Sequence, residues 1–147
     1  MKIIFFGAGY CTKYIIPLLP QNAEIICTHN NFIKPENFDS KFNIKRLLFR
    51  DIVNDKKKYF KNTTHILNSI PPKESGDLTI KKFKENIISI NKSLIWYGYF
   101  SSTSVYGDHS GDWVDEQSQL KPKTNRGRLR LLSESQHLEL FKKYKVP

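Results

Sequence analysis

Short apolar runs alternate with polar and helically spaced segments along this chain, a pattern that predicts a sheet flanked by helices. The first apolar run, residues 3–6, ends at a glycine pair, and apolar residues then recur with helical spacing as far as Leu19. Later apolar runs have strand length and are separated in the same way. The expected strands are residues 3–6, 23–28, 44–49, 63–70 and 93–100, and the expected later helices are residues 78–91 and 129–144.

Strands that alternate with helices are typical of a parallel sheet with helices on both faces. We therefore expect an α/β fold with a Rossmann-like, doubly wound parallel sheet that stops after about five strands. Right-handed crossovers would bring the ends of the first, fourth and fifth strands to one ligand-facing edge. Residues 32–42 are expected to be a polar connection, because Pro35 argues against a long helix there, and residues 53–62 a short basic helix or turn.

The glycine pair carries the first chemical signal. Gly7 would let the chain turn sharply, Gly9 would let a pyrophosphate approach the backbone, and the next helix would direct free N–H groups at that anion. Thr12 stands where the G-x-G-x-x-G pattern has its third glycine, so the helix must pack over a side chain. The alternative is a glycine turn that binds no ligand. The expected cofactor-binding residues are Gly7, Gly9, Tyr10, Cys11, Thr12, Thr28, Asn30, Asp51, Ser69 and Ser101.

The end of the second strand bears on the choice between NADP and NAD. An acid about 20 residues past the glycines usually holds the ribose hydroxyls of NAD, but residues 28–31 contain no carboxylate. Lys34 is nearby and no arginine is evident, so the sequence mildly favours NADP over NAD. Asp51 follows the third strand, where it would either bond the adenine amino group or cap the next turn.

Composition and charge exclude several classes of partner. The net charge is +10, but the lysines are scattered and not interleaved with exposed aromatics, so we expect no specific nucleic-acid partner. No apolar run reaches the length of a membrane span, so we expect no membrane partner and a cytoplasmic location. Cys11 and Cys27 have no metal-ligand or redox spacing, which predicts two buried thiols and no metal site.

The segment after the fifth strand carries a more specific resemblance. Residues 100–108 read F-S-S-T-S-V-Y-G-D, which resembles the S-S-x-x-V-Y-G-D segment of the extended and atypical short-chain dehydrogenase/reductases, the NAD-dependent epimerase/dehydratase family. With residues 111–116, residues 126–130, the glycine turn and Pro71-Pro72, the resemblance spans nearly the whole chain. It implies a Rossmann domain that binds NAD(P) and a relative of nucleoside-diphosphate-sugar epimerases and dehydratases, which act by hydride transfer.

Only part of that family's catalytic machinery is present. Ser102 stands where the family has its catalytic Ser or Thr, whose hydroxyl would bond the substrate oxygen that changes redox state. The family's Y-x-x-x-K motif is absent from the chain, and its register falls on residues 126–128. Asp77 lies near a polar position of the family and is equally explained as the N-cap of the following helix. Enzymatic activity of this chain therefore stays open at this point.

The resemblance also implies a missing part. Family members continue with a sixth strand and a C-terminal substrate lobe, so residues 1–147 correspond to an incomplete NAD(P)-binding domain, and a nucleotide-sugar substrate is expected only with that lobe. The alternatives are a non-catalytic dinucleotide-binding or interaction module and one half of a split enzyme. The fifth strand and last helix would leave an apolar edge that a homodimer or the missing half could cover.

Overall fold

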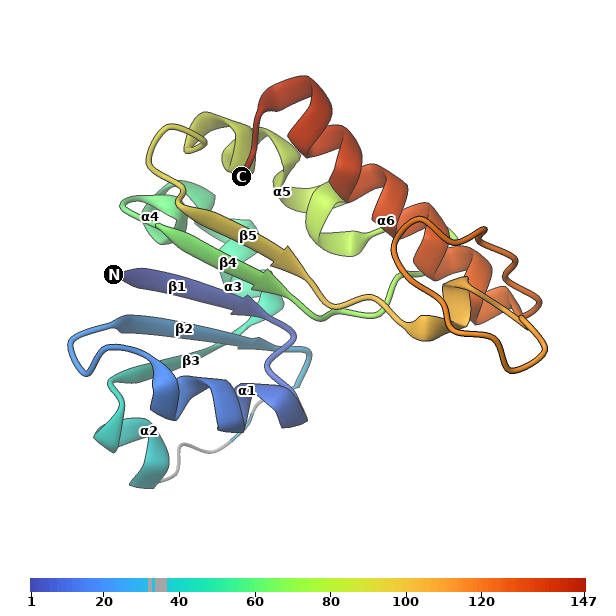
Figure 1. The fold of residues 1–147 in the computed structure, drawn as a ribbon. Helices are drawn as coiled ribbons and strands as arrows, with labels where there is room; N and C mark the ends of the chain where they lie inside the picture. The colour runs from blue at the N-terminus through green and yellow to red at the C-terminus, as the bar shows by residue number, and fades with distance from the viewer. Residues whose placement is uncertain (32, 34–36) are drawn as a thin grey trace.

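The chain folds into a five-stranded parallel sheet with flanking helices (Figure 1). The structure is a computed structural model, and it describes residues 1–31, 33 and 37–147. The strand order is β3-β2-β1-β4-β5, so the order reverses beside β1, and the predicted Rossmann-like α/β class is confirmed. The strands are β1 (Lys2–Phe6), β2 (Glu24–His29), β3 (Ile44–Leu48), β4 (His65–Asn68) and β5 (Trp96–Tyr99). The helices are α1 (Tyr10–Ile15), α2 (Asn37–Lys41), α3 (Phe49–Asn54), α4 (Lys56–Phe60), α5 (Leu78–Ser89) and α6 (Asn125–Tyr144), with the 3-10 turns η1 (Ile16–Leu18) and η2 (Thr103–Val105).

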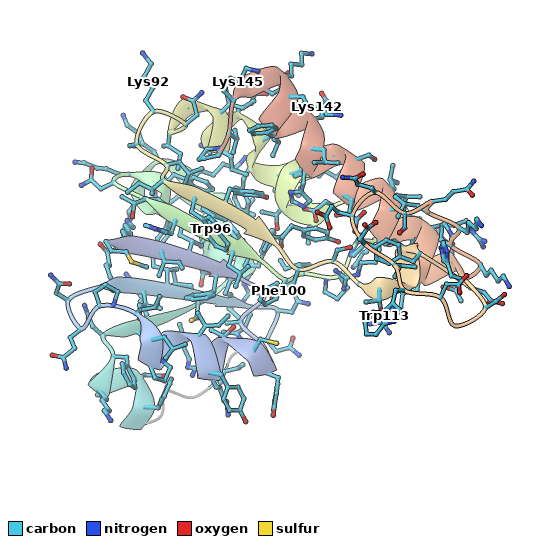
Figure 2. The ribbon with its side chains drawn as sticks, viewed as in Figure 1. Lys92, Trp96, Phe100, Trp113, Lys142 and Lys145 are labelled. Atoms are coloured by element: carbon cyan, nitrogen blue, oxygen red, sulfur yellow. The ribbon has the colours of Figure 1, made fainter. Side chains whose placement is uncertain are left out.

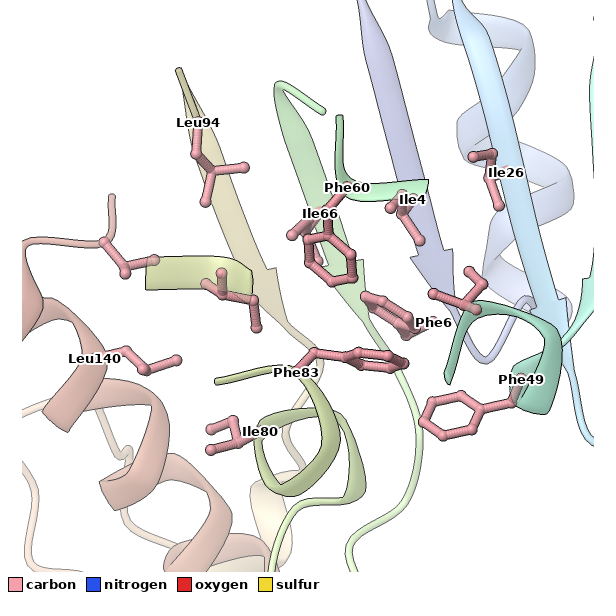
Figure 3. Packing of buried hydrophobic residues seen from close by; sticks show 13 residues of the cluster. Ile4, Phe6, Ile26, Phe49, Phe60, Ile66, Ile80, Phe83, Leu94 and Leu140 are labelled. Carbon is pink, nitrogen blue, oxygen red and sulfur yellow. The ribbon is translucent and has the colours of Figure 1, made fainter. Parts of the chain in front are cut away.

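The central strand β1 is buried on both faces, as is typical of parallel sheets. Ile4 and Phe6 belong to the larger core, together with side chains from α3, α4, α5 and α6 (Figure 3). Ile3 and Phe5 belong to a second core on the opposite face, where side chains of α1, η1 and α2 pack. The alternating apolar residues of one strand thus hold both helical layers against the sheet.

The third strand is shorter than predicted. It ends at Leu48, and the next residue already belongs to α3. The cause is Asp51, whose carboxylate accepts a hydrogen bond from the Leu48 backbone N–H at 2.9 Å and so stabilises the first helical turn. The polar connection before this strand contains the short helix α2, while Lys34 and Pro35 lie outside the described residues.

The last helix is longer than predicted and begins at Asn125 instead of Leu129. The side chain of Thr124 caps it by accepting a hydrogen bond from the Gly127 N–H at 3.0 Å. Gly127 also allows close packing, because an added Cβ would lie 2.6 Å from the Ser104 carbonyl oxygen of η2. In the described part of the chain, no helix combines the length and apolarity needed to cross a membrane.

The outer edge of β5 is partly occupied by the residues that follow α6. Lys145 takes a left-handed conformation with φ of 57°, which ends the helix and turns the chain back toward the sheet. Val146 is buried, and the Pro147 carbonyl accepts a hydrogen bond from the Tyr97 N–H at 3.1 Å. The apolar stripe expected along the last helix is exposed at Leu132, Leu138 and Phe141.

Replacing Phe83 tests the larger core. Phe83 is fully buried on α5, and its ring stacks on Phe6 with centroids 5.1 Å apart. We expect Phe83→Ala to lower the free energy of unfolding by about 3–5 kcal/mol because it leaves a cavity that the core cannot fill. Denaturant unfolding measures the loss, and Phe141→Ala, at a side chain 57% exposed, should change stability far less. Equal losses from the two variants would contradict this assignment of the core.

Candidate functional site

A cleft of about 550 Å³ opens at the carboxyl ends of the strands, beside the point where the strand order reverses. In open parallel sheets, ligands bind in a crevice at this position. The glycine turn, the end of β2 and the segment after β4 form its walls, and Phe100 adds to them from the end of β5 (Figure 2). The predicted site residues that line it are Gly7, Gly9, Tyr10, Cys11, Thr12, Thr28, Asn30 and Ser69.

Gly7 fixes the shape of the turn after β1. Its φ of 80° favours glycine, and an added Cβ would lie 2.9 Å from Cγ1 of Ile70. The Gly7 N–H donates to Oγ1 of Thr28 at 3.0 Å, and the hydroxyl of Ser69 donates to the Gly7 carbonyl. Thr28 and Ser69 therefore hold the turn between the two neighbouring strands and make up part of the cleft wall.

Gly9 leaves space in front of unpaired backbone donors. The nearest atom to an added Cβ would be the Gly7 carbonyl oxygen at 3.9 Å, so a side chain there would project into open space. In the described part of the chain, the N–H groups of Gly9, Tyr10 and Cys11 make no hydrogen bond. Consecutive free N–H groups around a glycine turn are suited to phosphate oxygens. The residues present thus fit the diphosphate of a dinucleotide.

Sequence reasoning missed an arginine beside the end of β2. Arg46 on β3 binds both carboxylate oxygens of Asp39, at 2.6 and 2.7 Å, and its Nη1 lies 3.1 Å from Nε2 of His29. Burial first and the charge of Arg46 second lower the pKa of His29, which keeps its imidazole neutral near pH 7. Parallel pairing places Arg46 opposite Cys27, a relation that local sequence patterns do not reveal.

Three other predicted residues lie outside the lining of the cleft. Asp51 caps α3 and borders an adjoining pocket that also includes His29. Ser102 caps η2, where its Oγ accepts from the Ser104 N–H at 3.3 Å and lies 3.0 Å from the Ser104 hydroxyl. The hydroxyl oxygen of Ser101 is buried and has no hydrogen-bond partner among the described residues. The catalytic role of Ser102 stays a prediction.

The two cysteines differ from each other, and the expectation of two buried thiols was wrong for one of them. Cys27 is buried in β2, and burial raises the pKa of its thiol to about 12. Cys11 is exposed, because it occupies the first turn of α1 at the wall of the cleft. Within the described ranges, no group of three or more His, Cys, Asp or Glu side chains is placed to hold a metal ion.

A buried polar cluster behind the cleft joins the sheet to α5 and α6. Asp77 caps α5 through the Ile80 N–H at 2.9 Å, and its other carboxylate oxygen accepts hydrogen bonds from Asn68 and Ser133 at 2.9 and 3.0 Å. Nε2 of His137 lies 3.3 Å from that same oxygen. Burial would raise the pKa of Asp77, but the hydrogen bond from His137 and the bonds from the neighbouring N–H and hydroxyl groups outweigh it and lower the pKa. Local sequence patterns do not reveal this role of His137, since its ring reaches the cluster only through the packing of α6.

The register that the family resemblance implies for the absent Y-x-x-x-K motif, residues 126–128, falls at the start of α6. Arg130 is buried, and its Nη1 donates to the Phe100 carbonyl at 2.7 Å and to the Tyr99 hydroxyl oxygen at 3.0 Å. Residues 126–128 contain two arginines and no tyrosine, which departs from the motif that the resemblance implies. The missing motif concerns proton transfer and does not affect the fold.

The sheet order, the glycine turn and the cleft define a Rossmann-like domain. No family model and no curated protein matches the chain. Among solved structures, a functionally unknown conserved protein from Silicibacter pomeroyi is 33% identical with a TM-score of 0.80, over 92% of this chain and 48% of that one. UDP-glucuronic acid 4-epimerase from Bacillus cereus, a Y149F mutant in complex with UDP-4-deoxy-4-fluoro-glucuronic acid and NAD, has a TM-score of 0.70 at 19% identity, over 100% of this chain and 54% of that one.

A third structure, UDP-N-acetylglucosamine 4-epimerase from Methanobrevibacter ruminantium in complex with UDP-N-acetylmuramic acid, has a TM-score of 0.69 at 12% identity, over 99% of this chain and 51% of that one. The fold is therefore that of the N-terminal part of nucleotide-sugar epimerases, as the resemblance in the sequence implied. The chain spans about half the length of these structures.

The pH dependence of stability tests the charge of Asp77. Because the pKa of Asp77 is lowered in the folded protein, its carboxylate stabilises the fold above the unfolded pKa, near 4, and this stabilisation is lost as the pH falls through the folded pKa. We expect Asp77→Asn to cost about 1–3 kcal/mol at pH 7. The difference from the parent protein should shrink when unfolding is measured at successively lower pH.

The matched control is Asp112→Asn, at an exposed carboxylate, which should leave the unfolding free energy at pH 7 unchanged. If Asp77→Asn costs the same at every pH down to about 3, the charge of Asp77 contributes nothing beyond the shape of its side chain.

Proposed function

We propose that this chain is the dinucleotide-binding domain of a protein related to nucleotide-sugar epimerases and dehydratases, and that NAD(P) binds in the cleft at the glycine turn. The observation that carries the proposal is the open space at Gly9 in front of three unpaired backbone N–H groups. That arrangement holds a diphosphate and gives no comparable advantage to an uncharged ligand.

Each part of the cofactor would contact a different wall of the cleft. The glycine turn takes the pyrophosphate, and the end of β2, with Asn30 and His29, takes the adenosine ribose. The segment Ser69–Pro71 and Phe100 then face the other half of the dinucleotide. A bound nicotinamide would supply hydride transfer, while Ser102 is this chain's candidate for bonding the substrate oxygen.

Full activity on a nucleotide sugar would require the substrate lobe implied by the family resemblance. The chain spans about half of the epimerase structures, so we place substrate binding in a second part of the functional protein. A non-catalytic dinucleotide-binding module is the second candidate. It is favoured by one observation, the absence of a Y-x-x-x-K motif from the sequence, since the register that the resemblance implies for it holds Arg126-Gly127-Arg128.

NADP is the favoured cofactor. Residues 28–31, at the end of β2, include no carboxylate that would repel a 2′-phosphate, and the guanidinium of Arg46 lies beside His29. The carboxylate of Asp39 is bound at both oxygens by Arg46. The net effect is a rim of amide and imidazole groups backed by a paired arginine, and such groups can accept a phosphate without charge repulsion.

Gly9→Val tests the site itself. The substitution places a branched side chain where the diphosphate would lie, while the surrounding atoms leave room for it, so the fold should be kept and binding of NAD and NADP lost. Isothermal calorimetry measures binding, circular dichroism checks the fold, and Leu18→Ala at an exposed position outside the cleft is the control. A parent protein that binds neither dinucleotide would refute the proposed function.

Asn30→Asp tests the cofactor preference. A carboxylate at this exposed position on the rim of the cleft should weaken NADP binding by about fivefold or more through repulsion of the 2′-phosphate, and should leave NAD binding equal or tighter. Asn22→Asp, at an exposed residue outside the cleft, controls for the change in net charge. Tighter binding of NAD than NADP by the parent protein would overturn the preference.

A further inference from the structure

The N-terminal end of α6 gathers positive charge where helices usually carry acids. Lys121 and Lys123 precede the helix, Arg126, Arg128 and Arg130 lie in its first two turns, and the first turn contains no acidic residue. The N-terminus of a helix already has a partial positive charge, so these cations oppose the dipole. A bound anion would remove this conflict.

Two backbone donors at this end of the helix have no partner among the described residues. Thr124 caps only the Gly127 N–H, and in the described part of the chain the N–H groups of Asn125 and Arg126 make no hydrogen bond. The guanidinium of Arg126 is exposed and forms neither an ion pair nor a hydrogen bond with any described residue. Two backbone donors and one charged side chain are thus available at the same turn.

A buried and unsatisfied arginine atom provides independent support for a ligand. Arg130 is only 6% exposed, and although its Nη1 has two acceptors, its Nε is buried with no partner among the described residues. A buried charged donor without an acceptor is costly and rare in folded proteins. Arg130 and Arg126 both line a pocket of about 180 Å³ whose opposite wall is Pro71 and Pro72.

This pocket adjoins the dinucleotide cleft. Pro71 lines both, and the Phe100 carbonyl that accepts the hydrogen bond from Arg130 belongs to a residue of the cleft wall. A ligand in the pocket would therefore lie next to the part of the cleft formed by the ends of β4 and β5. The two prolines have no N–H group, so the donors that face the pocket come from α6.

We propose that this pocket is an oxyanion site, in which Arg126, Arg130 and the free N–H groups of α6 bind a phosphate or carboxylate group of the substrate. Its relation to a substrate rests on the proposed function, whereas anion binding itself does not. The ligand class is an oxyanion because planar guanidinium groups bind two oxygens of phosphate or carboxylate in parallel hydrogen bonds.

The test is an NMR titration of the whole chain with inorganic phosphate and, separately, with acetate, at constant ionic strength set by sodium chloride. We expect saturable shifts of the Arg130 Nε–H and of the Arg126 backbone amide. A response to phosphate alone identifies a phosphate group as the ligand, and a response to acetate alone identifies a carboxylate. No saturable shift with either anion would overturn the proposal.

The decisive variant is Arg126→Gln, because Arg126 is exposed and its loss should leave the fold intact. We expect it to weaken anion binding by about fivefold or more. Lys142→Gln removes the same charge from the other end of α6 (Figure 2) and should leave binding unchanged. Equal weakening in both variants would mean non-specific attraction and would refute the site. Gly9→Val should bind the anion normally, so failure of the dinucleotide site and failure of this one can be told apart.

Discussion

The burial of β1 on both faces is the constraint on which the rest of this structure depends. Its four apolar side chains, residues 3–6, alternate between two cores, so helices must cover both sides of the sheet. The strand order of the sheet also reverses at β1. The chain must therefore turn sharply at the carboxyl end of β1. Gly7 meets this demand because its φ of 80° and the close approach of Ile70 leave no room for a side chain. The cleft is therefore a consequence of how the central strand is packed.

A second polar constraint fixes the position of α6. Asp77 is buried and holds hydrogen bonds from β4, from α5 and from Ser133 of α6, while the His137 ring stacks on Tyr99 of β5 with centroids 4.2 Å apart. Because each partner would leave a buried polar atom unsatisfied if it moved, these bonds define the placement of α6 more narrowly than apolar contacts alone. The α6 terminus with its arginines is thereby held beside the end of the cleft.

Local sequence patterns predicted the features that depend on neighbouring residues in the chain. They did not predict contacts between residues that are distant in the sequence. The strands and the glycine turn were predictable because strand and helix periodicities differ, and Asp77 was a readable N-cap. Arg46 was missed because parallel register brings it to His29 from another strand, and His137 because its partners lie on other elements. Cys11 was misjudged because apolar character predicts burial only on the inner face of a helix, and its face is the cleft wall. The third strand was drawn too long because an apolar run does not show where a capping carboxylate such as Asp51 starts a helix.

The arginines of α6 limit which chemistry this chain can perform with its own residues. A proton-transferring residue needs a pKa near the working pH, whereas an arginine guanidinium stays protonated under all ordinary conditions. Arg126 and Arg130 can therefore bind and orient an anion, but they cannot take a proton from a substrate hydroxyl as a Tyr/Lys pair would. Ser102 does not replace that pair, because its hydroxyl already caps η2 and is no base without a partner that accepts its proton. It follows that neither the arginines of α6 nor Ser102 can accept a proton from a substrate, whereas the guanidinium groups are suited to the recognition of an anion.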